Sequence, residues 1–260
     1  MKKLILFLVL IFITFQPLSG QNIYSALHHN DSGKPDLRKD IGVIKIIQET
    51  TFFNQSGPEI EKTELLLNES NRIVLENRYN ERYNRKTRLV FDYDSTEVRC
   101  LNRRMDVNQP YVSISETAHY EYNKDGFLTK ITDESNNEIF RITNIVNDES
   151  GNPVLLEGYE NSLFYGKETA DYDYENNIMK TTVYNSNGAI VSSNTGKINF
   201  SINDSNDLRN EYGDLIQSDP FKFEYKYDKK GNWKKQTRYK LKNDIWVKNA
   251  IFIRIITYKK

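Results

Sequence analysis

Aromatic and charged residues alternate strictly along residues 221–227. Four aromatic side chains occupy the odd positions and three charged side chains occupy the even positions. A period of two is typical of a β-strand with one buried face. The next stretch, Asp-Lys-Lys-Gly-Asn at 228–232, predicts a hairpin loop because Gly231 can adopt a positive φ. The alternation resumes from Trp233, so this part of the chain is predicted to form a β-hairpin.

Looser hairpins of the same kind recur upstream, separated by polar turns rich in Asn, Asp, Ser and Gly. These turns lie at residues 94–96, 123–126, 147–152, 175–177, 185–188 and 203–207. Successive hairpins are 22 to 30 residues apart, a spacing at which internal repeats are expected. Sustained helical stripes with caps are missing from the sequence. We therefore predict an all-β fold: one long, twisted antiparallel meander of successive hairpins, with little helix.

The N-terminus has the features of a secretory signal peptide. Lys2 and Lys3 precede an apolar run over residues 4–15, and small residues follow up to Gly20. The run is shorter than the ~20 residues that a membrane span needs, so cleavage after Gly20 is favoured over a retained anchor. The predicted organisation is a signal peptide at 1–20, a flexible leader at 21–40 and a single β-meander domain at 41–260. We expect an exported chain that is periplasmic, associated with the outer membrane or secreted, with no transmembrane segment after cleavage.

Two of the hairpin sequences resemble a known repeat. Residues 122–132, with a Tyr, a turn Gly and a returning apolar residue, resemble the YD repeat of RHS-type proteins. Residues 225–233 are more similar to the hairpins of small exported bacterial YD-repeat-like proteins, and the resemblance is strongest over 221–260. The turns at 174–177 and 203–206 lack the Gly of that pattern. The resemblance implies a repeat scaffold, and small members of this group mostly have no assigned activity.

The charge of the chain is balanced overall but not along its length. Without residues 1–20, 34 basic residues face 36 acidic ones, a net charge of −2, and residues 221–260 alone carry +10. If the hairpin aligns its basic side chains on one face, these form a patch for an anionic envelope polysaccharide or an acidic protein partner. The proposed patch comprises Lys222, Lys226, Lys234, Arg238 and Lys240. The alternative is that the basic end packs against acidic strands of the same chain. We expect no nucleic-acid partner.

Aromatic residues form a second candidate surface. Exposed, they would stack on sugar rings or peptides; buried, they would form the core of a thin sheet, which the alternation favours. The proposed platform comprises Tyr122, Tyr174, Tyr225, Tyr227 and Trp233.

The sequence offers little support for catalysis. Phosphate loops, zinc motifs and a nucleophile elbow are all missing, and the histidines, His28, His29 and His119, are too scattered to predict a metal site. The single cysteine, Cys100, lies in a strand-like context and is expected to be a small buried side chain. We predict no cofactor and a non-enzymatic binding or structural module of the bacterial cell envelope.

The alternative is a carbohydrate-active enzyme of the envelope that uses paired carboxylates on the sheet. Residues i and i+2 of a strand share one face, so Asp92 with Asp94, and Asp171 with Asp173, could act together. The same spacing also serves as ordinary edge protection by like charges.

Overall fold

The computed structural model describes residues 22–30, 33–37, 42–199 and 207–259. In these residues the chain forms one short helix and a sheet of 17 strands, as the alternation predicts. The elements are α1 (Ile23–Leu27), β1 (Val43–Asn54), β2 (Gly57–Leu67), β3 (Ile73–Asn80), β4 (Arg85–Tyr93), β5 (Cys100–Gln109), β6 (Val112–Tyr122), β7 (Leu128–Ser135), β8 (Glu138–Asn147), β9 (Pro153–Glu160), β10 (Leu163–Asp173), β11 (Ile178–Asn185), β12 (Ile190–Lys197), β13 (Leu208–Arg209), β14 (Leu215–Ser218), β15 (Phe221–Tyr227), β16 (Trp233–Lys242) and β17 (Ile245–Tyr258). No helix in these segments is long and apolar enough to cross a membrane.

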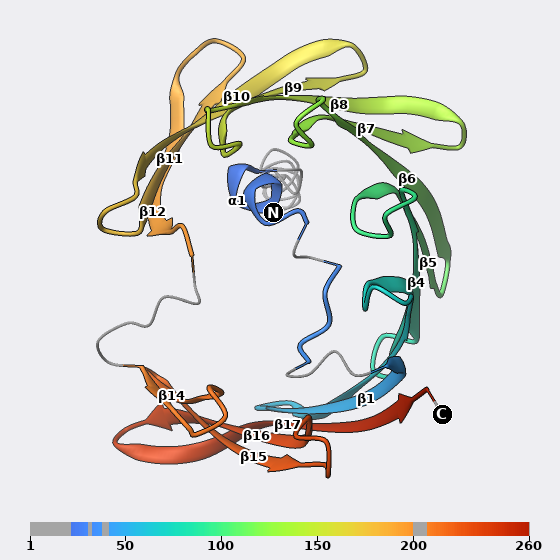
Figure 1. The fold of residues 1–260 in the computed structure, drawn as a ribbon, viewed down its shortest axis with the longest axis vertical. Helices are drawn as coiled ribbons and strands as arrows, with labels where there is room; N and C mark the ends of the chain where they lie inside the picture. Colours follow the sequence, from blue (N-terminus) through green and yellow to red (C-terminus); the bar gives the residue numbers. More distant parts are fainter. Residues whose placement is uncertain (1–21, 31–32, 38–41, 200–206, 260) are drawn as a thin grey trace, which may run out of the picture.

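The sheet is an antiparallel meander that curls until the first and last strands of the chain pair with each other. Each strand pairs with the next from β1 to β12 and again from β13 to β17. The last strand, β17, also pairs antiparallel with β1, from Val43 opposite Tyr258 to Phe52 opposite Ala250. No pairing joins β12 to β13 in the described residues, so the sheet stays open there. Figure 1 shows the resulting ring of strands with α1 inside it.

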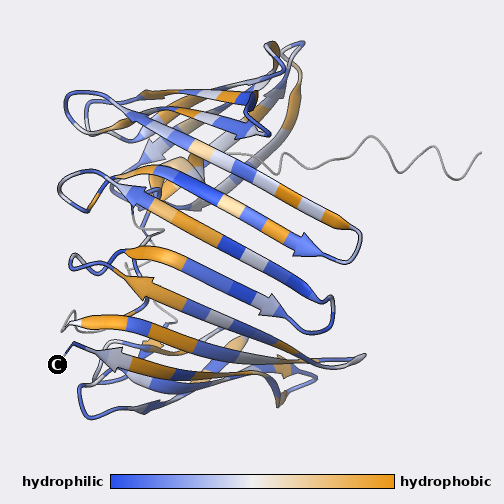
Figure 2. Cartoon of the chain, turned by 90° about the vertical axis from the view of Figure 1, so that its right-hand side faces the viewer, coloured by the Kyte–Doolittle hydropathy of each residue, from blue (hydrophilic) through white to orange (hydrophobic). Residues whose placement is uncertain are grey.

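The buried apolar residues form two clusters on the concave side. One joins Ile23 of α1 to side chains such as Ile131 and Leu156 of the sheet. The other contains Val43 and Ile46 of β1, with Leu37 packed against it. Hydrophilic and hydrophobic residues are interspersed along the strands (Figure 2), because successive side chains point to opposite faces.

Six loops in the described chain share one local structure, which explains the repeating turn signal. In each, an Asn or Asp begins a five-residue loop whose first N–H donates to the carbonyl of the fifth residue, and the fourth N–H donates back to the first carbonyl. The first residues of these loops are Asn68, Asn123, Asp148, Asn185, Asn210 and Asp228. The side-chain oxygen of the first residue also accepts from loop N–H groups, as Asp228 does from residues 230 and 232. The fourth residue has a positive φ and is Gly in five loops and Asn71 in the sixth.

Substitutions at the fourth loop position test whether the positive φ there requires glycine. Gly188 has a φ of +79°, and the space around its absent Cβ is open. Gly188→Ala should therefore lower the free energy of unfolding by about 1 kcal/mol through backbone strain alone, and Gly188→Asn should lower it less. Gly196→Ala is the matched control, because that glycine lies in β12 with open space around it and no positive φ. Urea denaturation measures all three; an equal effect of the two alanine variants would contradict this explanation.

Candidate functional site

Residues 22–30 and 33–37 lie on the concave side of the sheet and begin at α1. Asn22 caps the helix by accepting from the Ser25 N–H at 2.7 Å. The Ile23 N–H donates to Oε2 of Glu168 in β10 at 2.9 Å, and burial raises the pKa of that carboxyl group. Ile23 is fully buried. These contacts attach the start of the segment to one side of the ring.

The remainder of this segment reaches the opposite side of the ring. The Gly33 carbonyl accepts from the Ile73 N–H at 2.9 Å. Further along, the Asp36 carboxylate accepts from the Trp233 indole at 2.9 Å, and its carbonyl accepts from Arg254 at 2.8 Å. A Cβ on Gly33 would lie 2.6 Å from the Tyr93 hydroxyl, so a larger residue at this position would require the Tyr93 side chain to move. The described parts of the segment thus contact opposite sides of the ring, β10 near its start and β16 and β17 near its end.

The sequence predicts a flexible leader over 21–40, whereas its described residues hold a helix and these contacts. The difference arises because the partners are far away in sequence, 145 residues for Ile23 with Glu168 and 197 for Asp36 with Trp233. A local signal does exist: Asn22 is a good N-cap, and the apolar residues 23, 26 and 27 follow at helical spacing.

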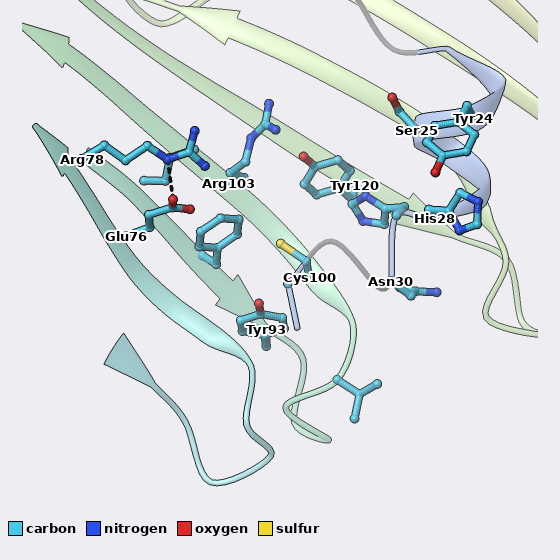
Figure 3. A pocket seen from close by; sticks show the side chains of 15 residues that line it. Tyr24, Ser25, His28, Asn30, Glu76, Arg78, Tyr93, Cys100, Arg103 and Tyr120 are labelled. Carbon is cyan, nitrogen blue, oxygen red and sulfur yellow. Dashed lines mark hydrogen bonds and ion pairs between the residues drawn. The ribbon is translucent and has the colours of Figure 1, made fainter. Parts of the chain in front are cut away.

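A cavity of about 390 Å³ lies between this segment and strands β3 to β6. One wall comes from Ser25, His28 and Asn30, and the other from inward-facing residues of the sheet (Figure 3). The sheet wall includes Glu76, Arg78, Phe91, Cys100, Arg103 and Tyr120. Its size is in the range of small-molecule sites.

Of the two arginines that line the cavity, only Arg78 has an ion-pair partner in the described chain. Arg78 donates to the carboxylate of Glu76, which is buried. Arg103 has no ion pair in the described chain, and its Nε is out of solvent contact with no hydrogen-bond acceptor. The cavity therefore contains one compensated and one uncompensated guanidinium group.

Several neighbours of Arg103 stay neutral at physiological pH. Burial, with a smaller effect of the Arg103 charge, lowers the pKa of His29 to about 4. Burial raises the pKa of the Cys100 thiol and of the Tyr120 hydroxyl, each to about 12. The lining thus holds neutral hydrogen-bonding groups around one unpaired cation.

Sequence reasoning missed Arg103, although a signal was present. Residues 103 and 104 are consecutive arginines in a predicted strand, and consecutive residues point to opposite faces. One of the two had to face the interior. Arg104 lies on the outer face, where it pairs with Asp106 at 3.1 Å.

The position of His29 predicts acid sensitivity. Its ring lies 4.2 Å from the Tyr120 ring, and Nε2 lies 3.0 Å from the Tyr122 hydroxyl. Since its pKa falls from 6.5 to about 4 on folding, the unfolded chain binds the extra proton first. Stability should be full above pH 6.5 and should decrease by up to about 3 kcal/mol as the pH falls to about 4.

Urea denaturation at pH 7, 5.5 and 4.5 measures this loss. His29→Gln keeps a donor for Tyr122 but removes the titration, so its stability should change less over this range. His119→Gln, at a position on the outer face that contacts Asn102 and Glu134, should retain the loss of stability that His29 causes. An equally steep loss in His29→Gln would show that another group is responsible.

The proposed aromatic platform is divided in the structure. Tyr225, Tyr227 and Trp233 form one cluster, with ring centroids 6.0 and 6.4 Å apart. Tyr122 contacts His29, and Tyr174 stacks on Tyr172 at 5.5 Å. These are three separate places on the sheet rather than one surface.

The tyrosine hydroxyl groups of the platform bind neighbouring hairpins. Tyr174 donates to the Asp148 carboxylate at 2.5 Å and accepts from Asn152 at 2.7 Å. Tyr227 is bound in the same way by Asp214 at 2.6 Å and Asn210 at 2.7 Å. Each of these hydroxyl groups connects the end of a strand to an Asn/Asp loop of a neighbouring hairpin, which is a structural role.

If the hydroxyl groups have this structural role, removing the hydroxyl oxygen of Tyr174 should lower the stability of the fold. Tyr174→Phe should lower the free energy of unfolding by about 1 kcal/mol, because the bond to Asp148 is charge-assisted but half exposed. Tyr184→Phe is the control, since the Tyr184 hydroxyl has no hydrogen bond in the described chain; it should change stability by less than ~0.5 kcal/mol. Thermal unfolding of both variants distinguishes them, and equal melting temperatures would argue against the role.

The proposed basic patch does not lie on one face. Lys222 and Lys226 stand opposite Tyr239 and Lys235, whereas Arg238 and Lys240 stand opposite Phe223 and Phe221. Arg238 lies 5.2 Å from the Phe221 ring centroid, on the aromatic face. The predicted alignment is wrong because the register shifts by one residue between Lys226 and Tyr227, leaving Lys234 as an extra residue.

Contacts of the basic C-terminal region with the rest of the chain support the alternative of internal packing. Arg254 lies 3.7 Å from the Asp36 carboxylate, and Lys259 lies 2.8 Å from Glu69 in the β2–β3 loop.

The other sequence candidates lie in ordinary surroundings. Asp94 and Asp173 accept hydrogen bonds from their own turns, which lowers the pKa of both. Asp92 and Asp171 stand opposite Asn102 and Lys180. In the described residues no group of three or more His, Cys, Asp or Glu side chains could hold a metal ion.

Comparison with known proteins gives little further information. No protein-family model and no curated protein matches the sequence. Among solved structures, the fold is similar to that of a porin-like protein from Bacteroides uniformis ATCC 8492, with a TM-score of 0.42 and 11% identity. The match covers 83% of this chain and 96% of that chain, and it is too weak to transfer a function.

Proposed function

We propose that this chain is an exported, non-enzymatic binding module of the bacterial cell envelope, and that its ligand occupies the cavity between residues 24–30 with Gly33 and strands β3 to β6. The observation that carries the proposal is the cavity itself. Its two walls come from distant parts of the chain, and polar groups such as Ser25, Asn30 and Arg103 line it. A concave, partly apolar site with a few convergent polar groups is typical of small-molecule binding.

The chemistry of the lining favours binding over catalysis. The Cys100 thiol and the Tyr120 hydroxyl have raised pKa values, so neither supplies a nucleophile or a base near neutral pH. Glu76 is paired with Arg78. These groups can orient a ligand by hydrogen bonds and charge, which a binding protein requires.

The proposed similarity to small YD-repeat-like proteins concerns the scaffold of hairpins and not the ligand. The shared geometry of the Asn/Asp loops supports it, as does the use of tyrosine hydroxyl groups between hairpins. An envelope polysaccharide or acidic protein partner for the C-terminal region remains a separate hypothesis, and it would now concern Lys222 and Lys226 without Arg238 and Lys240.

The alternative function is a carbohydrate-active enzyme of the envelope. Each pair of carboxylates includes one residue that accepts bonds from its own turn, Asp94 or Asp173. A glycan-hydrolysis screen on the native chain and on variants with Asp92, Asp94, Asp171 or Asp173 changed to Asn tests it. Activity that one of these changes abolishes would replace the binding proposal.

Filling the cavity tests the binding proposal. Ser25 is exposed on α1 and lines the cavity, so Ser25→Phe should block a ligand without disturbing the core. Ser186→Phe, in the exposed loop after β11, is the control. In a calorimetric screen of sugars, sugar acids, amino acids and aromatic acids, the native chain and Ser186→Phe should bind the same compound. Loss of at least about 10-fold in affinity is expected for Ser25→Phe. Undiminished binding by Ser25→Phe would place the ligand elsewhere.

A further inference from the structure

We infer that the ligand of this cavity is a small organic carboxylate that binds to Arg103; the inference rests on the proposed function. Arg103 lies in the middle of β5, opposite Phe91 of β4 and Ala118 of β6. Residues opposite each other in an antiparallel pair share a face, so its guanidinium group stands among these side chains on the concave side. Figure 3 shows it directed into the space beside Tyr120.

Arg103 differs from the other arginines that contact the interior. Four of these donate to an acceptor of the chain: Arg72 to the Asn30 carbonyl, Arg78 to Glu76, Arg141 to Asp133 at 2.7 Å and Arg254 to Gln48 at 2.8 Å. Arg103 has no hydrogen bond and no ion pair in the described chain, and its Nε is inaccessible to water. A buried donor without an acceptor is unfavourable, so this guanidinium group would gain from an acceptor that the protein itself does not supply.

The surroundings of Arg103 define the kind of acceptor. Its neighbours His29, Cys100 and Tyr120 are neutral, so the charge to be matched is a single positive one. A carboxylate carries a single negative charge and matches the planar guanidinium fork with two parallel hydrogen bonds. A phosphate group would bring up to two charges against one cation.

The rest of the cavity defines the body of the ligand. Phe91 and Tyr120 offer aromatic surfaces next to Arg103, whereas Ser25 and Asn30 offer polar groups on the facing wall. A ring that carries a carboxylate, with or without hydroxyl groups, satisfies both walls. The volume of about 390 Å³ limits it to a small molecule.

The test compares matched anionic and neutral probes by calorimetry on the full chain. Benzoate is paired with benzamide, and glucuronate is paired with glucose. At least one acid should bind about 10-fold or more tightly than its neutral partner, in the native chain and in Arg104→Gln. Arg103→Gln should lose this preference, and Arg103→Lys, which keeps the charge without the fork, should lose about 10-fold in affinity. Inorganic phosphate, added as a competitor, should displace the acid only weakly.

A second readout separates binding from a structural role. An arginine that holds the fold together would destabilise the chain when replaced, whereas Arg103 has no partner to lose. Arg103→Met should therefore melt no lower than the native chain without ligand. A clearly lower melting temperature would overturn the inference.

The outcomes also separate this inference from the proposed function. If a probe binds and Ser25→Phe abolishes binding, but neutral and anionic probes bind equally or Arg103→Gln binds normally, the cavity is a binding site and the carboxylate inference is wrong. Preference for phosphate over the acids also overturns the inference. If no probe and no compound of the wider screen binds, both proposals fail together.

Discussion

The antiparallel pairing of β1 with β17 is the constraint on which the rest of the structure depends. It joins residues 43–52 to residues 250–258, more than 190 positions apart in the chain. Without this ladder, β1–β12 and β13–β17 would be two separate sheets, because no pairing joins β12 to β13 in the described residues. Pairing β1 with β17 joins them into one curved sheet, whose concave side is the interior of the molecule. The entropic cost of closing so long a loop rises only slowly with its length, so one long ladder is sufficient to offset it.

Once there is an interior, the N-terminal segment can fill it. Its helix lies against β9 and β10, and Asp36 near its end binds Trp233 of β16 and Arg254 of β17. Those two strands are in position because β17 is paired with β1. Because the interior is wide, many inward positions are polar, and charged residues there are compensated in pairs such as Asp133 with Arg141. Polar inward positions explain how a chain with few aliphatic residues still forms a defined structure.

Features fixed by local rules could be predicted from the sequence, and features fixed by distant contacts could not. The alternation along 221–227 and the Asn/Asp loops depend on a few neighbouring residues, and both match the structure. The face of each basic residue in β16 depends on one register shift beside the Asp228 loop, and a slip of one residue moves every later side chain to the other face. The placement of residues 22–30 and 33–37 depends on partners such as Glu168 and Trp233, which no local pattern identifies. The candidate site could not be predicted for both of these reasons. One of its walls is the N-terminal segment, and the other is a set of side chains whose inward direction depends on the register of four strands.

Residues that recur with the hairpin repeat have a structural role, whereas a residue outside the repeat can indicate function. Tyrosine hydroxyl groups recur as bonds from one hairpin to the carbonyl groups of a neighbouring one, from Tyr93 to Ile73, from Tyr122 to Cys100 and from Tyr172 to Pro153. Tyrosines that recur with the repeat are therefore explained by the scaffold, and their number says little about ligands. Arg103 is not explained by the repeat, and it has no acceptor in the described chain, whereas Arg72, Arg78, Arg141 and Arg254 each have one. A scaffold that supplies acceptors to other interior arginines points most clearly to function where it leaves a buried guanidinium N–H without one.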